Sequence, residues 1–303
     1  MTLNELRYIV AVAQELNFRR AAEKSCISQP ALSLAIQKLE VELGIEIFER
    51  GKNEISITPI GIAIVEQAQR VLEEAEGIRS IAAQGKNQLA APLRIGIIYS
   101  VCPYLLPELI PSLKKIAPDM PLEVEENITA NLDTLLRNGK LDVIIIALPF
   151  GDTGILTHSV YDEDFEVVVN SEHHWAKRSS IKASELTEEK VLMLNSGHCF
   201  SNQVAEACPD LNRKGADIRQ GTSLETIRNM VASGLGITVL PASANNARYR
   251  NRLLKVIPFA KPVPSRRIAL AWRKSFTRTQ AIDALVKAIM LAKITGIKQL
   301  LSP

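Results

Sequence analysis

Apolar positions in the first forty-four residues recur at the step of an amphipathic helix, and polar caps divide the pattern into three segments. Asn17 is a suitable N-cap for a second helix over Phe18–Lys24, and Ser28 for a third from Gln29 to about Leu43. Gly44 follows as a terminating glycine. Two short helices joined by a tight turn predict a helix-turn-helix, with the second as the recognition helix.

Residues 45–58 alternate apolar and polar side chains around Gly51-Lys52-Asn53, which predicts a β-hairpin, or wing, with a basic tip. A small helical domain that binds nothing in particular would show the three helices without this wing. We therefore expect DNA binding, with small polar residues facing base edges and basic residues facing phosphates. The expected contacts are Arg19, Ser28, Gln29, Pro30, Ser33, Gln37, Lys38, Arg50 and Lys52.

A single long helix is predicted over residues 59–86, because its apolar side chains form a coiled-coil seam. The seam consists of Ile64, Ala68, Val71, Ala75, Ile78 and Ala82. The small N-terminal domain offers no obvious cover for it, so a second copy of the chain is the simplest partner; packing on the C-terminal part of the same chain is the alternative. The expected domains are 1–58 for DNA binding, 59–90 for the linker (dimerisation) helix and hinge, and 91–303 for an effector domain.

From residue 93 onward the pattern alternates between short apolar strands and helices, which predicts an α/β fold with helices covering largely parallel sheets. Ligand sites of such folds lie at the carboxyl ends of strands. Ser100 follows the first strand and Thr129 follows another, while Val191–Asn195 leads into a segment with Cys199. We expect these three positions to converge.

The 303 residues suffice for two or three domains, and a net charge of +3 says little about an anionic partner. The densest apolar run, Val143–Leu148, is too short to span a bilayer, and no signal peptide is recognisable. We therefore expect a cytoplasmic protein that does not enter a membrane. Cys26 and Cys102 belong to no metal-ligand spacing, so neither a metal nor a cofactor is expected.

Cys199 and Cys208 are separated by eight residues. A helical spacer would place their Cα atoms ~13 Å apart, whereas a disulfide needs them within roughly 7 Å. The pair therefore lies on a sharply bent loop, bonds only after refolding, or consists of two core cysteines that never meet.

Several motifs make the chain similar to LysR-type transcriptional regulators over its whole length. They are Phe18-Arg-Arg-Ala-Ala-Glu, Ser28-Gln-Pro-Ala-Leu-Ser33, Ile36-Gln-Lys-Leu-Glu40, Leu43-Gly44 and Phe48-Glu-Arg50. The resemblance implies a winged helix-turn-helix, a linker helix and a periplasmic-binding-protein-like effector domain of two subdomains. Subdomain I would comprise 91–161 and 268–303, and subdomain II 162–267. It also implies homodimers or homotetramers on double-stranded promoter DNA.

Within that family the chain resembles the peroxide-sensing branch, which carries Tyr104-Leu-Leu-Pro107, Gly139-Lys-Leu-Asp142, Gly197-His-Cys199, Cys208 and Thr222-Ser-Leu-Glu-Thr226. This resemblance implies a regulator of the oxidative-stress response that works with RNA polymerase. Cys199 would react with hydrogen peroxide and Cys208 would resolve it to a disulfide. The implied peroxide pocket is Ser100, Thr129, His198 and Arg266, with Ser100 in place of the more usual threonine. Pro209–Arg213 departs from the pattern.

Two alternatives remain open. The chain would be a LysR-type regulator gated by a small metabolite if DNA binding responded to a ligand and ignored peroxide. It would be a thiol peroxidase if Cys199 turned over peroxide with a recycling reductant, although a peroxidase has no need of a DNA-binding module. We therefore expect a regulator and not an enzyme.

Overall fold

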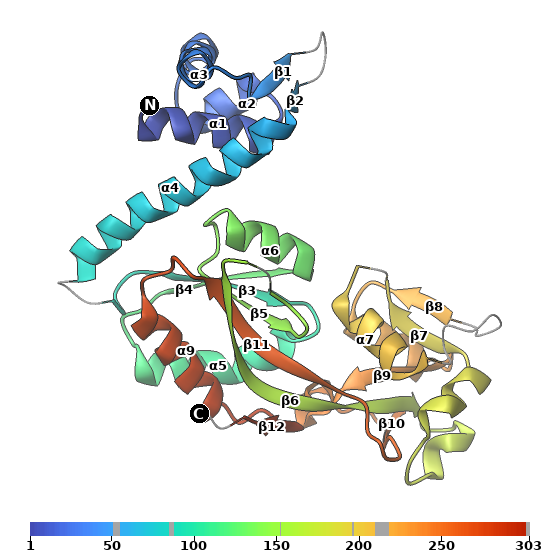
Figure 1. Cartoon of the computed structure of the whole chain (residues 1–303). Coiled ribbons are helices and arrows are strands. Elements are labelled where there is room, and N and C mark those ends of the chain that lie inside the picture. Colours follow the sequence, from blue (N-terminus) through green and yellow to red (C-terminus); the bar gives the residue numbers. More distant parts are fainter. Residues whose placement is uncertain (51–54, 85–87, 152, 196, 210–217, 301–303) are drawn as a thin grey trace. The chain divides into compact units, whose positions relative to one another are not determined.

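The computed structural model describes residues 1–303 except 51–54, 85–87, 152, 196, 210–217 and 301–303, and it divides into two compact units, Met1–Lys86 and Asn87–Pro303 (Figure 1). The N-terminal unit holds three short helices, a hairpin and a long helix. These are α1 (Leu3–Glu15), α2 (Phe18–Lys24), α3 (Gln29–Leu43), β1 (Phe48–Arg50), β2 (Ile55–Ile57) and α4 (Pro59–Gln84).

The caps predicted for α2 and α3 are confirmed. The Asn17 side chain accepts a 3.0 Å hydrogen bond from the Arg20 N–H, and Ser28 accepts one of 3.4 Å from Ala31. Gly44 ends α3 in the left-handed region, at φ 69°. Strands β1 and β2 pair antiparallel, so the wing is present, but its tip with Lys52 lies outside the described residues.

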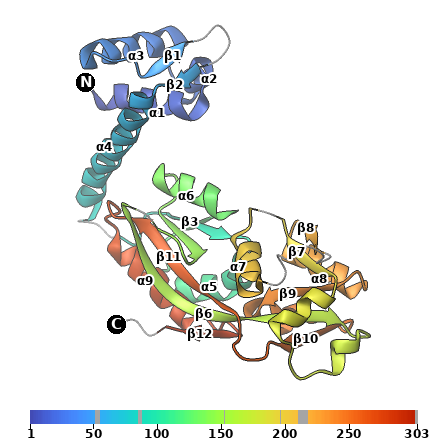
Figure 2. The same ribbon diagram turned by 45° about the vertical axis from the view of Figure 1, so that its right-hand side comes forward.

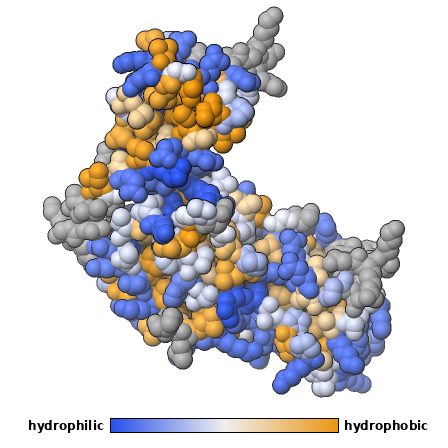
Figure 3. All heavy atoms as spheres, in the orientation of Figure 1, coloured by the Kyte–Doolittle hydropathy of each residue, from blue (hydrophilic) through white to orange (hydrophobic). Residues whose placement is uncertain are grey.

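The prediction that nothing in the N-terminal unit covers the seam of α4 is wrong for the first half of the helix. Ala68 is buried, and Ile64 and Val71 pack on the core that α1, α2 and α3 form, because α1 lies against α4. Further along, the Ile78 side chain is 69% exposed, so the described residues of this unit leave it largely uncovered. Figure 3 shows apolar surface on the viewer's face of the unit.

The C-terminal unit has the predicted alternation of strands and helices. Its first part contains β3 (Leu93–Ile98), α5 (Cys102–Ile116), β4 (Leu122–Asn127), α6 (Thr129–Arg137), β5 (Val143–Ala147) and β6 (Ile155–Asn170). After two 3-10 turns come β7 (Val191–Leu194), α7 (Cys199–Ala207), β8 (Ile218–Gly221), α8 (Leu224–Ala232) and β9 (Ile237–Pro241). The chain finishes with β10 (Leu254–Pro258), β11 (Ser265–Arg273), α9 (Thr279–Leu291) and β12 (Ile297–Gln299).

The strands join edge to edge in the order β4-β3-β5-β11-β6-β9-β7-β8, with β10 and β12 also paired to β6. The expected parallel pairing holds for β3 with β4 and β5, and for β7 with β8 and β9. It is wrong for the centre, where β11 runs antiparallel to both β5 and β6. The sixteen residues of β6 form one strand that continues from one half of the unit into the other.

Two hydrophobic cores divide this unit into a first lobe, built on β3, β5, α5 and α9, and a second lobe, built on β7, β9, α7 and α8. Figure 2 shows α7 on the side of the second lobe that borders the first. Among the described residues, no helix combines the length and apolar character that crossing a membrane would require.

Candidate functional site

Cys199 and Cys208 stand at opposite ends of α7. Cys199 is the first residue of this nine-residue helix, and Cys208 caps its end with an N–H bond to the Val204 carbonyl. Neither cysteine forms a disulfide; Cys199 is half-buried and Cys208 is 1% exposed in the core of the second lobe. Nine helical steps place their Cα atoms ~13 Å apart, which excludes a disulfide in this conformation. The sharply bent loop is therefore ruled out for this state.

Local contacts fix α7 in its helical form. Ser201 lies in its first turn and donates a buried 2.7 Å hydrogen bond to the Leu194 carbonyl at the end of β7. Phe200 packs edge-on against Phe165 of β6, with ring centroids 5.2 Å apart. Cys199 lies in the first turn of the helix, where the helix dipole favours a negatively charged side chain.

Arg266 lies beside this helix as part of a buried polar cluster. Its guanidinium pairs with Glu163, opposite it in the β6–β11 ladder, at 2.6 Å, and neither side chain is exposed by more than 1%. It also donates to the Ser100 hydroxyl at 2.7 Å and to the Ser100 carbonyl at 3.0 Å. The structure thus joins two of the expected pocket residues, Ser100 and Arg266, directly.

The same guanidinium ties the cluster to α7, because its central carbon lies 4.9 Å from the centre of the Phe200 ring. Cys199, which precedes Phe200, packs against the core of the first lobe, whereas Phe200 belongs to the core of the second. The Cys199 end of α7 is therefore set between the lobes, next to the Arg266 cluster.

His198 caps the start of α7, and its ring lies 5.4 Å from that of Tyr99. Burial lowers the pKa of His198 below its ordinary value of 6.5. The imidazole of His198 is therefore uncharged near neutral pH. Arg266 is charged but already shares that charge with Glu163.

Thr129 begins α6 directly after β4, at the same edge of the sheet as Ser100. Ile98 pairs with Asn127 in the parallel ladder between β3 and β4. Ser100 and Thr129 each come two residues after a member of this pair. The Thr129 hydroxyl is buried and has no hydrogen-bond partner within the part of the chain that the structure describes. This side chain consequently has an unused donor near the carboxyl ends of β3 and β4.

Gln203 was not identified from the sequence, although it lies one turn after Cys199 in α7. Its amide nitrogen donates to the Leu148 carbonyl at 3.2 Å, while its buried oxygen has no partner among the described residues. The spacing of four residues in a predicted helix is the signal that could have revealed it. Glu163 was also missed, since its partner lies far along the chain.

The two other cysteines are Cys102, at the start of α5, and Cys26 in the N-terminal unit. Burial, together with the nearby Glu126 carboxylate, raises the pKa of Cys102 to about 12, so its thiol stays protonated. Cys26 is exposed in the N-terminal unit.

One set of metal-ligand atoms, those of His173, His174 and Glu189, lies within 4.8 Å of one another among the described residues. The His173 Nδ1 accepts a hydrogen bond from the Trp175 N–H at 3.1 Å, which leaves its proton on Nε2, 3.4 Å from Glu189. These contacts satisfy the ring without an ion.

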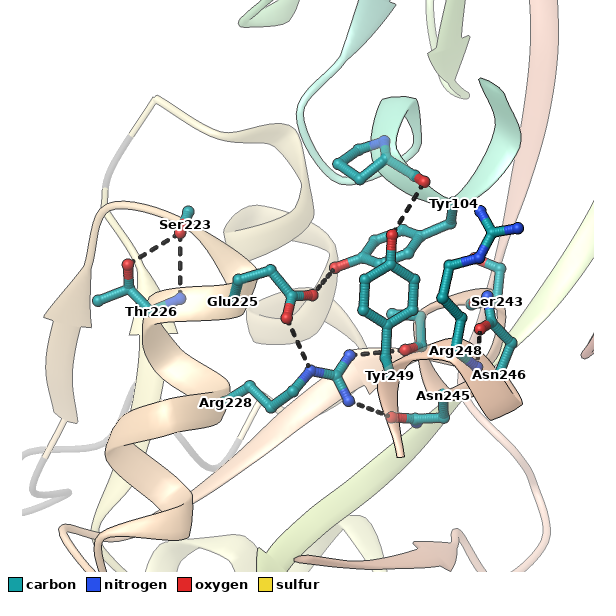
Figure 4. A network of polar contacts seen from close by, with 12 residues as sticks. Tyr104, Ser223, Glu225, Thr226, Arg228, Ser243, Asn245, Asn246, Arg248 and Tyr249 are labelled. Atoms are coloured by element: carbon teal, nitrogen blue, oxygen red, sulfur yellow. Dashed lines mark hydrogen bonds and ion pairs between the residues drawn. The ribbon is translucent and has the colours of Figure 1, made fainter. Parts of the chain in front are cut away.

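A second polar network joins the start of α5 to the second lobe (Figure 4). The Tyr104 hydroxyl donates to Glu225 of α8 at 2.9 Å, and Tyr249 donates to the Pro103 carbonyl at 3.1 Å. Arg228 bonds Glu225 at 3.3 Å and the Ala244 carbonyl at 2.6 Å. The start of α5 is thereby fixed to the second lobe only a few residues after Ser100.

In the N-terminal unit, most of the expected DNA contacts are exposed, namely Arg19, Ser28, Gln29, Pro30, Gln37 and Lys38. Ser33 is only half-exposed, next to the buried side chains of Leu32 and Ile36. The side chains of Arg50 and Lys52 lie outside the described residues.

Two family models match the chain and cover both units. "Bacterial regulatory helix-turn-helix protein, lysR family" matches residues 3–62, and "LysR substrate binding domain" matches residues 86–291. The chain belongs to the LysR family. It is 37% identical over 289 residues to the DNA-binding transcriptional dual regulator OxyR of Escherichia coli, covering 95% of each chain. It is 38% identical to a hydrogen peroxide-inducible genes activator of Haemophilus influenzae, covering 95% and 96%.

Solved structures of LysR-family regulators are similar as well. A full-length OxyR from Pseudomonas aeruginosa with a cysteine-to-aspartate substitution is 50% identical, with a TM-score of 0.82 over 100% of this chain and 99% of the other. A hydrogen peroxide-bound cysteine mutant of OxyR from Corynebacterium glutamicum is 34% identical, with a TM-score of 0.64 over 98% and 96%. The predicted family and fold class, a winged helix-turn-helix with an α/β effector domain, are confirmed.

Proposed function

We propose that this chain is a DNA-binding transcriptional regulator switched by hydrogen peroxide through a reversible Cys199–Cys208 disulfide. The observation that carries the proposal is the position of the two thiols at opposite ends of α7, beside the Ser100–Arg266 cluster. Bond formation requires this helix to unwind, so a chemical event at one sulfur becomes a change of fold. The Haemophilus influenzae relative, named as a hydrogen peroxide-inducible genes activator, supports the same assignment.

The chemistry proceeds in two steps. The Cys199 thiolate attacks one oxygen of hydrogen peroxide, the O–O bond breaks, and the departing hydroxide takes up a proton to leave as water. The resulting sulfenic acid is then attacked by the Cys208 sulfur; the S–S bond forms and a second water is released. Reduction by a dithiol restores both thiols and the helix.

The pocket residues have distinct roles in this scheme. The buried Thr129 hydroxyl and the Gln203 amide oxygen have unused hydrogen-bonding capacity, which suits a small polar molecule such as peroxide. Arg266 holds Ser100 in place and faces the ring after Cys199. His198 takes part as a neutral ring. Cys199 and Cys208 react once per oxidation event, so we expect a sensor that does not consume peroxide continuously.

Double-stranded operator DNA is the proposed partner of α3 and the wing, and RNA polymerase the partner at promoters, in the cytoplasm. The exposed apolar residues Ile60, Ile62 and Ile78 of α4 support a homodimer through this helix, which could assemble further into a homotetramer. A dimer presents two recognition helices to the two halves of an operator. Light scattering of the purified chain tests the association.

Mass spectrometry and DNA binding, measured together, test the switch. One equivalent of peroxide should convert the two thiols into an intramolecular disulfide that reductant removes, and should change the binding to promoter DNA. Cys208→Ser is the matched variant: it should stop at a sulfenic acid on Cys199 that dimedone traps. A wild-type chain whose DNA binding ignores peroxide but responds to a metabolite would contradict the proposal. Continuous peroxide consumption with a recycling reductant would instead indicate a peroxidase.

A metabolite-gated regulator remains the second candidate because of an open groove of about 620 Å³ next to the site. Leu148, Phe150, Arg266 and Arg267 contribute to its lining. A ligand that fills this groove and alters DNA binding in the Cys199→Ser variant would favour that candidate.

A further inference from the structure

The outward face of α3 carries a large apolar side chain that the proposed DNA contacts leave unexplained. Leu34 is 68% exposed, more than Ser33 beside it, which is only half-exposed. Figure 2 shows α3 on the outside of the N-terminal unit, and its core-facing side chains are Leu32, Ile36 and Leu39. Leu34 therefore projects away from the protein core.

Three of the four neighbours of Leu34 on the helix surface are proposed DNA-contacting residues. Residues three and four apart lie side by side on a helix, so Leu34 is bordered by Pro30 and Ala31 in the turn before it and by Gln37 and Lys38 in the turn after it. All four are exposed. If this face lies in the major groove, Leu34 is at the centre of the contact and not at its rim.

Within the major groove, the apolar group that base pairs expose is the 5-methyl of thymine. A leucine has no hydrogen-bonding group, so it cannot read the donors and acceptors of the other bases. We propose that Leu34 is a specificity-determining residue that selects a thymine methyl in the operator. This inference rests on the proposed DNA-binding role of α3 and adds to it the base that the helix recognises.

Deoxyuridine replacement provides the test, because deoxyuridine lacks only the methyl of thymine and keeps the same base pairing. A preferred operator is first selected from random duplexes by the wild-type full-length chain. Each thymine is then replaced singly by deoxyuridine, and affinities are measured by fluorescence anisotropy for wild type and Leu34→Ala. At one thymine of a half-site, wild type should lose about fourfold in affinity, the value of one methyl group returned to water.

The decisive result is a coupling between the side chain and the methyl. Leu34→Ala should bind the thymine and deoxyuridine duplexes equally at that position, while retaining the wild-type response at other thymines. Val41→Ala is the matched control: Val41 is 82% exposed on α3 but lies two turns further from the helix N-terminus, so it should behave as wild type. Because Leu34 is exposed, the variant should melt at the wild-type temperature.

The alternative occupant of this face is a second copy of the chain. In that case Leu34→Ala would change the mass measured by light scattering, and no thymine would show the coupling; this outcome overturns the inference. A selected operator without any coupled position would also overturn it and leave the regulator proposal intact. Failure of the wild-type chain to select any operator, in reducing buffer or after peroxide, would remove the DNA-binding role itself.

Discussion

Arg266 and Ser100 are joined by two hydrogen bonds although they are far apart in sequence: the guanidinium of Arg266 donates to the Ser100 hydroxyl at 2.7 Å and to its carbonyl at 3.0 Å. The guanidinium also forms a buried ion pair with Glu163 at 2.6 Å. One side chain from β11 thereby fixes the turn after β3, on which the proposed peroxide pocket is built.

Replacement of Arg266 by Leu should destabilise the reduced protein by about 3–5 kcal/mol, because it leaves the Glu163 carboxylate buried and unpaired. Adding Glu163→Leu should recover part of that loss, since the uncompensated charge is then gone. Urea unfolding of the reduced proteins measures both effects. Arg267→Ala is the control, as its pair with Asp162 is partly solvated and should matter little. Equal losses for the Arg266 and Arg267 variants would contradict this account.

Thiol labelling should separate the four cysteines into two classes. N-ethylmaleimide at pH 8 should modify Cys26, which is exposed, and Cys199, which is half-buried. It should spare Cys208, which is buried, and Cys102, whose burial raises its pKa to about 12. Peptide mass spectrometry after brief labelling of the reduced native protein checks this. Urea-unfolded protein supplies the reference in which all four cysteines are labelled. Fast modification of Cys102 in the native protein would contradict the prediction and would mean that the structure around this thiol opens readily.

The pH dependence of stability should include a contribution from His198. Burial lowers the pKa of this ring in the folded protein below the ordinary 6.5, so the unfolded chain binds the proton more readily. Stability is therefore unaffected above that value and falls as the pH drops below it. His198→Gln should weaken this decline, as measured by urea unfolding at pH 7.5 and 5.5. Identical declines in both proteins would show that the ring is solvated.

The elements of the N-terminal unit could be predicted from the sequence because their signals act over a few residues. Asn17, Ser28 and Gly44 cap or end their helices through contacts within a single turn. The exposure of single residues on α3 is harder to predict: Ser33 is half-exposed and Leu34 is exposed because of how the helix packs against other helices. The cover that α1 gives to the first half of α4 has the same origin.

Prediction of the candidate site depended more on the resemblance to a known family than on the pattern of residues in the sequence. The cysteine spacing left the refolding hypothesis open, and only the helical form of α7 excludes the bent loop in this state. Arg266 pairs with Glu163 because of the register between β6 and β11. These strands are neighbours in the sheet, but the residues of the second lobe lie between them in the sequence. No periodicity within either strand specifies that register, which is why Glu163 was missed.

The Ser201 hydrogen bond to the Leu194 carbonyl should set the redox potential of the switch. It stabilises α7 in the reduced form, and unwinding of the helix for the disulfide should break it. Ser201→Ala should therefore destabilise only the reduced state. A neutral hydrogen bond is worth ~1 kcal/mol, so the reduction potential should become more negative by about 20 mV. Equilibration with glutathione buffers, followed by thiol trapping and mass spectrometry, measures the shift.

Thr238→Val is the matched control. Thr238 donates a buried 2.7 Å hydrogen bond to the carbonyl of Leu192, which lies in β7 like Leu194 but outside the refolding segment. Its loss should lower the stability of both redox states equally and leave the potential unchanged. An unchanged potential for Ser201→Ala as well would show that the start of α7 keeps its helical contacts in the oxidised protein, and that Cys208 alone moves.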